Sequence, residues 1–331
     1  MAQNPLGYSQ INCLIFTEGI LGIGYTGNEV QVGQYGDEPY DNLPKAMVKA
    51  GLIKSNAYSL WLNDLDASEG SILFGGVNTE KYHGTLETLP VQEVNGGYSA
   101  FYIALTEVAL STSSKNKKYT PDSSLPAAVL LDSGSSLTYL PNAIVKEIYD
   151  DLSVTYIPSD GVGYVPCSLA NNDFNISYTF SSPVINVSGR ELVLDNGDSH
   201  FRNGDRACIF GIVPADGSSA VLGDTFLRSA YVVYDLANNE ISLANTNFNS
   251  TEDNIVEIGT GTDAVPSATA VANPVTSVVV GGSGARIGGP HGGGSDIFGT
   301  TSTHNAAVPR ATSMPRNLAL GFAGAGALLA L

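Results

Sequence analysis

Short apolar runs separated by turn-forming residues recur from residue 17 to about residue 250, and they constrain the fold more than any other feature of the chain. The runs that predict strands are rich in β-branched and aromatic residues: 58–62, 71–74, 102–105, 230–234 and 240–243. Turn pairs such as Gly75-Gly76 and Asn238-Asn239 separate them. Helix signals are confined to residues 42–50 and 141–149. The pattern predicts an all-β fold that is mainly antiparallel, with few short helices.

The charge balance excludes several kinds of partner. Asp and Glu total 32 against 15 Lys and Arg, which gives a formal net charge of −17 at pH 7. Nucleic-acid binding needs a cationic face, and so does attachment to an anionic membrane by charge alone. We therefore expect no nucleic-acid partner. The four histidines (His83, His200, His291 and His304) are too scattered for a metal site, so we expect neither a metal nor a cofactor.

One segment delivers an acidic residue from the end of an apolar strand. Val129-Leu130-Leu131 leads directly into Asp132-Ser133-Gly134-Ser135-Ser136. Glycine allows a tight turn, and the hydroxyls of Ser133 and Ser135, with nearby backbone N–H groups, can hydrogen-bond the carboxylate and keep it ionised. An Asp that merely stabilises a strand-to-turn corner shows the same triplet. The motif alone leaves a catalytic and a structural role open.

A repeated fragment connects this segment to a known family. Ile20-Leu21-Gly22 and Val221-Leu222-Gly223 share an apolar–Leu–Gly core and suggest two related halves. With them, the chain resembles the pepsin-like aspartic proteases, most of all the fungal candidapepsin and yapsin branch. The stretches that carry the resemblance follow the family's order: 19–25 (GILGIGY), 57–62 (AYSLWL), 70–77 (GSILFGGV), 130–140 (LLDSGSSLTYL) and 221–243.

The resemblance implies a bilobal fold in which each lobe supplies one Asp-Thr/Ser-Gly loop, braced by an apolar–apolar–Gly strand. Asp132 matches the catalytic Asp of the second lobe. The residues that match substrate-binding positions are Gly134, Ser135 and Ser136. Those that match the support of the loops are Ser133, Val221, Leu222 and Gly223 in the second lobe and Ile20, Leu21 and Gly22 in the first.

The cysteines agree with this assignment. A bridge between Cys167 and Cys208, which are 41 residues apart, is plausible from their spacing, and the resemblance implies it as the second-lobe disulfide. Cys13 is left without a partner.

The family is an aspartic-type endopeptidase family that hydrolyses peptide bonds with two carboxyls sharing one proton and a water molecule as nucleophile. The chain contains no second Asp-Thr/Ser-Gly triplet, and too few residues precede Ile20 to hold the first-lobe loop. We therefore expect most of the first lobe to be missing, the chain to be truncated at its N-terminus, and peptide hydrolysis by the chain as given to fail. A non-catalytic anchored cell-wall protein that uses the fold to bind peptide or glycan is the alternative.

The C-terminal residues predict lipid attachment. Small residues Asn305-Ala306-Ala307, a polar spacer over 308–317 and an apolar tail over 318–331 follow the order of a glycosylphosphatidylinositol (GPI) signal. Asn305 is the expected attachment residue, with Ser302 and Ala306 as alternatives. The first residues lack the basic and apolar regions of a signal peptide.

Asn-x-Ser/Thr triplets also indicate the secretory pathway; they begin at Asn175, Asn186 and Asn249. We expect a secreted monomer that acts on peptides or proteins, anchored at the plasma membrane or cell wall through lipid alone. The expected segments are 1–16 (unplaced, consistent with a gene-model error), 17–90 (first-lobe remnant and interlobe sheet), 91–250 (second lobe), 251–304 (a Gly/Ser/Thr/Ala-rich stalk) and 305–331 (GPI signal). Cleavage specificity does not follow from the sequence.

Overall fold

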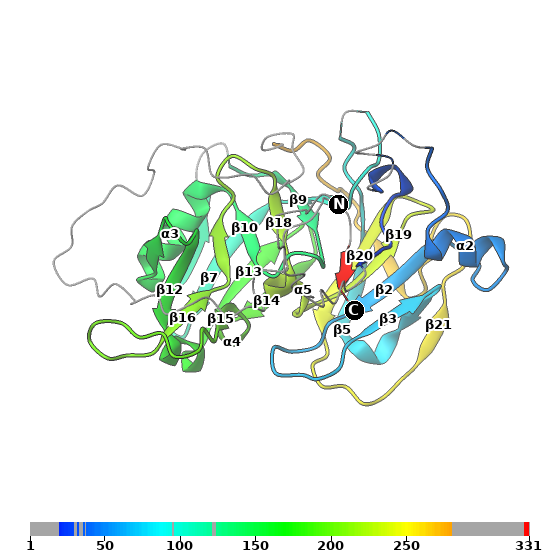
Figure 1. Cartoon of the computed structure of the whole chain (residues 1–331). Coiled ribbons are helices and arrows are strands. Elements are labelled where there is room, and N and C mark those ends of the chain that lie inside the picture. Colours follow the sequence, from blue (N-terminus) through cyan, green and yellow to red (C-terminus); the bar gives the residue numbers. More distant parts are fainter. Residues whose placement is uncertain are drawn as a thin grey trace, which may run out of the picture.

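The computed structural model describes residues 20–29, 32, 36, 38–94, 96–120, 124–279 and 328–330 of the chain. Their strands form two bodies that lie side by side, with few short helices (Figure 1). The predicted mainly antiparallel β fold is confirmed.

Sheet I forms the right-hand body in Figure 1, which we call the first lobe. Its strands lie in the order β22 (Ala268–Ala270), β5 (Tyr82–Pro90), β20 (Glu240–Thr246), β19 (Ala230–Asp235), β2 (Ala57–Trp61) and β3 (Ser71–Phe74). Neighbouring strands are antiparallel, except that β22 runs parallel to β5. Residues 230–246, which lie within the segment 91–250 predicted as the second lobe, therefore cross into sheet I.

Both faces of sheet I are covered, which explains the uninterrupted burial of β19. Side chains alternate between the faces of a strand. Val232 and Tyr234 enter the main core, whereas Tyr231 and Val233 enter a second apolar cluster with Trp61.

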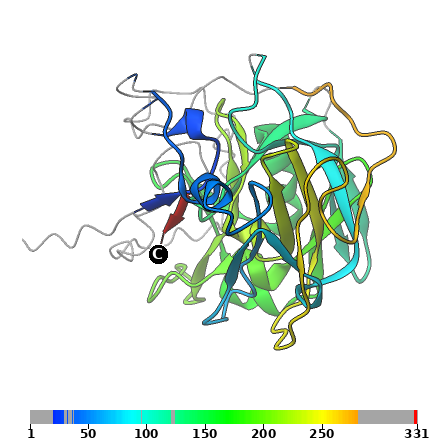
Figure 2. The ribbon, with the colours of Figure 1, turned by 90° about the vertical axis from the view of Figure 1, so that its right-hand side faces the viewer.

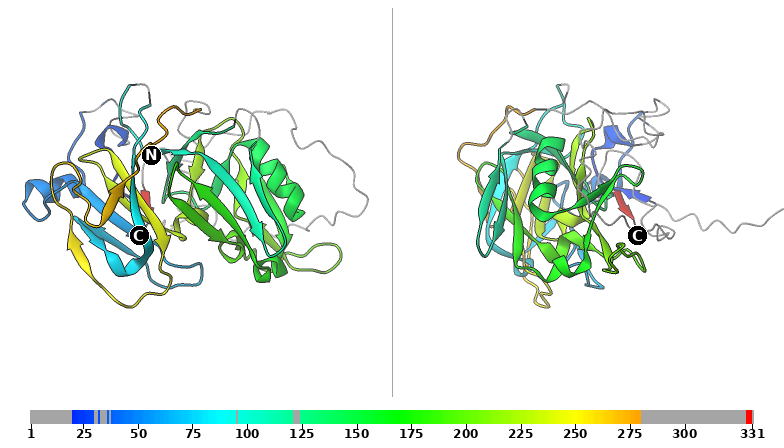
Figure 3. Two further views of the ribbon diagram at one scale, coloured as in Figure 1. Left: turned by 180° about the vertical axis from the view of Figure 1, so that it is seen from behind. Right: turned by 90° about the vertical axis from the view of Figure 1, so that its left-hand side faces the viewer.

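Residues 247–279, which we call the strap, cover this second face and correct one prediction. Within the strap, β21 (Ile255–Glu257) pairs with β4 (Gly76–Asn78), and β22 joins sheet I. Ile258, Ala264 and Val265 are buried in the second cluster. The prediction of a stalk over residues 251–304 is therefore wrong for residues 251–279, which pack against sheet I. A few small apolar side chains suffice to cover the open apolar face of the sheet. Figures 2 and 3 show the strap, in yellow and orange, running along the outside of sheet I.

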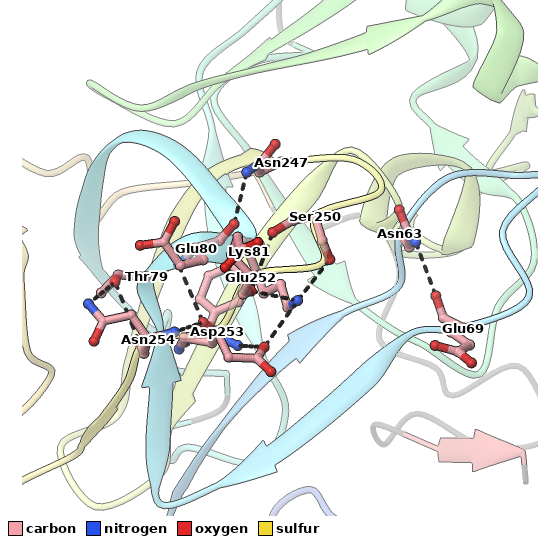
Figure 4. A network of polar contacts seen from close by, with 12 residues as sticks. Asn63, Glu69, Thr79, Glu80, Lys81, Asn247, Ser250, Glu252, Asp253 and Asn254 are labelled. Carbon is pink, nitrogen blue, oxygen red and sulfur yellow. Dashed lines mark hydrogen bonds and ion pairs between the residues drawn. The ribbon is translucent and has the colours of Figure 1, made fainter.

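A buried lysine fastens the start of the strap (Figure 4). Lys81 donates from Nζ to the carbonyl oxygens of Ser250 and Glu252, at 2.9 Å each, and pairs with Asp253 at 3.1 Å. The Nζ atom also lies 4.7 Å from the ring centroid of Trp61. These contacts hold the start of the strap against the 3-10 turn over residues 79–81, which carries Lys81.

The left-hand body in Figure 1, which we call the second lobe, contains three sheets in the described part of the chain. Sheet II has the order β17 (Ile212–Pro214), β10 (Thr138–Leu140), β18 (Ala220–Leu222), β9 (Ala127–Leu131) and β6 (Tyr102–Leu105). Sheet III has the order β14 (Val184–Ser188), β13 (Phe174–Thr179), β7 (Glu107–Thr112) and β8 (Asn116–Tyr119). Sheet IV has the order β11 (Thr155–Ile157), β12 (Val162–Pro166), β16 (Ala207–Phe210) and β15 (Val193–Leu194).

The helices include both predicted ones. They are α2 (Leu43–Lys49), α3 (Asn142–Leu152), α4 (Gly189–Leu192) and α5 (Asp224–Leu227), with the 3-10 turns η1 (Thr26–Asn28), η2 (Thr79–Lys81) and η3 (Cys167–Asn171). Asn42 caps α2 by accepting a hydrogen bond from the Lys45 amide, and Pro44 lies in its first turn. Within the residues that the structure describes, no helix has the length and apolar character needed to cross a membrane.

One disulfide and one strand pair involve residues that the sequence analysis singled out. The disulfide between Cys167 and Cys208 is present, with an S–S distance of 2.01 Å, and joins η3 to β16. β1 (Ile20–Gly22) pairs antiparallel with β23 (Leu328–Ala330). Cys13, Asn305 and the other residues of the expected GPI signal, apart from β23, lie outside the described residues.

Candidate active site

Asp132 directly follows β9, an interior strand of sheet II. Every residue of β9 is buried between β18 and β6, and the chain turns immediately after Leu131. The side chain of Asp132 is buried, and both carboxylate oxygens accept hydrogen bonds: Oδ1 from the Gly134 amide at 3.0 Å and Oδ2 from the Ser135 hydroxyl at 2.8 Å. Such bonds stabilise the negative charge.

The loop presents four residues at the surface. Ser133, Gly134, Ser135 and Ser136 are partly exposed, whereas the chain on both sides of them is buried. Three of these residues are those that the resemblance matches to substrate binding. These residues can therefore be reached from solvent, next to a carboxylate that is held in place.

The strand β18 supports the loop from the side. Leu222 lies opposite Leu131 in parallel register, and its carbonyl accepts a hydrogen bond from the Asp132 amide at 3.1 Å. At Gly223, a Cβ atom would overlap the backbone oxygens of Ser135 and Leu137, so only glycine fits. Val221, Leu222 and Gly223 thus lie beside the Asp132 loop.

The first copy of the fragment has different surroundings. A Cβ atom at Gly22 would meet nothing within 4 Å, and the strand partner of Ile20, Leu21 and Gly22 is β23. The described residues contain no second Asp-Thr/Ser-Gly loop for β1 to brace.

A second acidic residue lies beneath the Asp132 loop. The amides of Asp224 and Thr225, at the start of α5, donate to the carbonyl oxygens of Ser135 (2.8 Å) and Ser136 (3.3 Å). Burial raises the pKa of the Asp224 carboxyl to about 7; the Arg228 guanidinium opposes this rise and the nearby Asp132 adds to it. The raised pKa therefore favours the protonated form of the Asp224 carboxyl, which interacts with the charge of Asp132.

Tyr234 is a further neighbour of the two acids. Its hydroxyl is buried and has no hydrogen-bond partner among the described residues. Burial raises the pKa of this phenol, and the charges of Asp132 and Asp224 add to the effect. Sequence reasoning missed both Asp224 and Tyr234, although Asp224 directly follows the predicted brace and could have been found by that position.

Other predicted positions are separate from the loop. Asn186 and Asn249 are exposed and Asn175 is partly exposed, and the side-chain nitrogen Nδ2 of Asn249 donates to the Asp64 carboxylate. Nowhere in the described ranges do three or more His, Cys, Asp or Glu side chains come together in positions that could hold a metal ion.

Comparison with known proteins gives consistent results. The family described as "Eukaryotic aspartyl protease" matches residues 7–246. "Probable aspartic-type endopeptidase opsB" of Aspergillus oryzae is 68% identical over 330 residues, which cover 99% of this chain and 67% of the relative. The Aspergillus fumigatus protein of the same name is 67% identical over 92% of this chain and 62% of its own length. "Aspartic proteinase yapsin-3" of Saccharomyces cerevisiae is 37% identical over 76% of this chain and 49% of its own length.

Among solved structures, the aspartic proteinase from Irpex lacteus superposes with a TM-score of 0.55 at 16% sequence identity, covering 71% of this chain and 69% of that one. This likeness shows the fold alone.

The chain spans 62–67% of the length of the two Aspergillus relatives.

Proposed function

Because the chain belongs to the eukaryotic aspartyl protease family, we propose that it carries the second-lobe half of an aspartic endopeptidase site, with Asp132 as one of two catalytic carboxyls. The observation that carries the proposal is the setting of Asp132. Its carboxylate is buried, is held by the Gly134 amide and the Ser135 hydroxyl, and adjoins a partly exposed loop.

The proposed chemistry needs a second carboxyl that faces Asp132. Two carboxyls a few ångströms apart share one proton, since like charges at that distance do not both ionise readily. The ionised partner removes a proton from water, and the protonated partner donates to the carbonyl of the scissile peptide. Gly134, Ser135 and Ser136 would bind the backbone of a peptide or protein substrate and hold it in place.

A chimera tests this function. The part of the Aspergillus oryzae relative that this chain does not match would be joined ahead of the chain, and cleavage of a fluorogenic peptide would be followed in acid. We expect the chimera to hydrolyse the peptide, and we expect the chain alone and the chimera with Asp132→Asn to fail. Asp195→Asn, at an exposed residue, is the matched control and should retain activity. Hydrolysis by the Asp132→Asn chimera would contradict the assignment.

We also propose that the protein belongs to the candidapepsin and yapsin branch and is secreted, glycosylated and anchored at the cell surface by GPI. The order of small residues, spacer and apolar tail over 305–331 supports this. Expressed in yeast behind a secretory signal peptide, the protein should be released from cells by a phosphatidylinositol-specific phospholipase. Removal of residues 318–331 should send it to the medium directly, whereas surface retention after that removal would argue against the anchor.

A further inference from the structure

A buried ion pair lies beneath α5, away from the surface of the Asp132 loop. Glu191, in α4, and Arg228, directly after α5, have side chains that are 3% and 11% exposed. Arg228 donates from Nε to Glu191 Oε2 at 2.5 Å and from Nη2 to the Glu191 carbonyl at 2.7 Å. Removing one partner of such a pair leaves a buried charge without compensation, so the two residues depend on each other.

The other oxygen of the same carboxylate reaches the first lobe. Glu191 Oε1 accepts a hydrogen bond from the Leu65 amide at 3.2 Å. Leu65 lies in the loop over residues 62–70, which joins β2 and β3 of sheet I. Next to it, Arg190 forms an exposed ion pair with Asp66. One buried carboxylate therefore contacts both lobes.

Arg228 connects this pair to the catalytic loop. Its amide donates to the Asp224 carbonyl at 3.0 Å and closes α5. The first two amides of α5 hold the carbonyl oxygens of Ser135 and Ser136. Leu65 is thus connected to the Asp132 loop by a continuous series of contacts. The series consists of the hydrogen bonds of Glu191 and Arg228 and of the short helix α5.

The same ion pair places a charged group near the Asp224 carboxyl. The groups that act on its carboxyl include Arg228, which stabilises the charged form, and Asp132, which opposes it. The Tyr234 hydroxyl, on β19, is influenced by the same two carboxyls. Glu191, on α4, pairs with Arg228 and so partly neutralises the charge of its guanidinium.

We propose that Glu191 and Arg228 are positioning residues of the active site, which hold α5 against the Asp132 loop and set the charge that Asp132 and Asp224 face. The proposal deepens the proposed function and rests on it, because it gives a role to residues that act through Asp132. Neither residue contacts the substrate in this role.

The test measures the titration of Asp224 by carboxyl ¹³C NMR in the full chain and in single variants. Arg228→Met should move the midpoint upward by about one pH unit, because a favourable charge is lost. Glu191→Gln should move it downward, because the guanidinium is no longer neutralised. Arg228→Lys keeps the charge and should stay near the wild type. Arg206→Met, in an exposed pair with Asp195, is the control and should change nothing.

The expected midpoint shifts have opposite signs in Arg228→Met and Glu191→Gln, and this difference distinguishes a positioning role from a role in fold stability alone. If the pair merely stabilised the fold, both losses would loosen α5 and move the midpoint downward, toward the ordinary Asp value. A downward shift in Arg228→Met, or no shift in either variant, overturns the proposal.

The double variant Glu191→Gln/Arg228→Met leaves no buried charge unpaired. If Arg228→Met does not fold, this double variant decides, and it should still move the midpoint upward because Arg228 acts directly on Asp224. The titration does not require peptide hydrolysis, so its failure is distinguishable from failure of the chimera.

Discussion

At Gly223 the backbone passes so close to the Asp132 loop that the absence of a side chain becomes a requirement. The carbonyl oxygens of Ser135 and Leu137 occupy the space that a Cβ atom would need. Gly22, in the matching sequence fragment, faces open space instead. The shared apolar–Leu–Gly pattern thus has different consequences at the two sites, because the packing partners of each glycine decide whether a methyl group can be tolerated.

Gly223→Ala should destabilise the chain by about 3 kcal/mol, since backbone atoms on both sides must shift to admit the methyl group. Urea unfolding followed by tryptophan fluorescence would measure the change. Gly22→Ala is the matched variant and should alter stability by less than about 1 kcal/mol. Equal effects at the two glycines would argue against the close approach of β18 to the loop.

At the scale of elements, helix α3 is attached to sheet III mainly through the carboxylate of Asp151, while Glu147 of the same helix pairs with Lys117 at 3.0 Å. Asp151 accepts hydrogen bonds from Lys115 Nζ at 2.7 Å, Lys117 Nζ at 2.8 Å and the Tyr119 hydroxyl at 3.1 Å. Burial alone would raise the pKa of Asp151, but these donors outweigh it and lower the pKa from 3.8 to about 2. The carboxylate is therefore bound in its charged form.

The attachment of α3 should consequently weaken in acid. Because the folded-state pKa is below the unfolded one, the stabilisation is complete above about pH 4 and is lost as the pH falls toward 2. Asp151→Asn should cost about 1–2 kcal/mol at pH 6, allowing for solvent screening of the lysines, and almost nothing at pH 2. Urea unfolding at the two pH values measures this. Asp150→Asn, in an exposed pair with Lys146, should have little effect at either, and a pH-independent loss at Asp151 would contradict the ionic origin.

The start of the strap is held by one side chain as well, that of Lys81 (Figure 4). Lys81→Met should leave the carbonyl groups of Ser250 and Glu252 without their donor, at a cost of about 1–3 kcal/mol. Hydrogen exchange should then accelerate over residues 250–257. Lys54→Met, in an exposed pair with Glu257, is the control and should change exchange little. Unchanged exchange in Lys81→Met would show that β21 is held by its strand pairing alone.

At the scale of the whole molecule, the strap connects the two lobes. It covers the outer face of sheet I with Ile258, Ala264 and Val265. Farther along, the Val275 amide donates to the Ser181 hydroxyl at 3.0 Å, and the backbone of Val279 exchanges hydrogen bonds with Pro126 (2.8 Å) and Ala128 (3.0 Å), at the start of β9. Residues beyond the family match at 246 therefore hold both sheet I and the strand that delivers Asp132.

A chain that ends at residue 246 should lose this cover. Its outer face would expose Trp61, Tyr231 and Val233, so we expect increased binding of a hydrophobic dye and a Tm lower by about 5 °C or more. A chain that ends at residue 279 keeps the strap and should match the full chain. Equal Tm values for the 246 and 279 chains would show that the strap adds no stability.

Much of this architecture could be predicted from local pattern. Strands β2, β3, β6, β19 and β20 and helices α2 and α3 lie where alternation and turn residues indicated them, because such elements depend on neighbours a few residues away. The Asp132 loop was predictable for the same reason, since its motif is contiguous. The Cys167–Cys208 bridge followed from the resemblance and agreed with the spacing.

By itself, the sequence determined the element types, the acidic loop and the family. Tertiary structure alone decided that residues 251–279 pack as a strap and that Glu191, Arg228 and Asp224 meet beneath Asp132. The physical reason is that burial depends on which faces remain uncovered after distant strands have paired, and a composition rich in small residues does not reveal it. Likewise, the raised pKa of Asp224 arises from burial and from charges that the fold brings together, which no local pattern records.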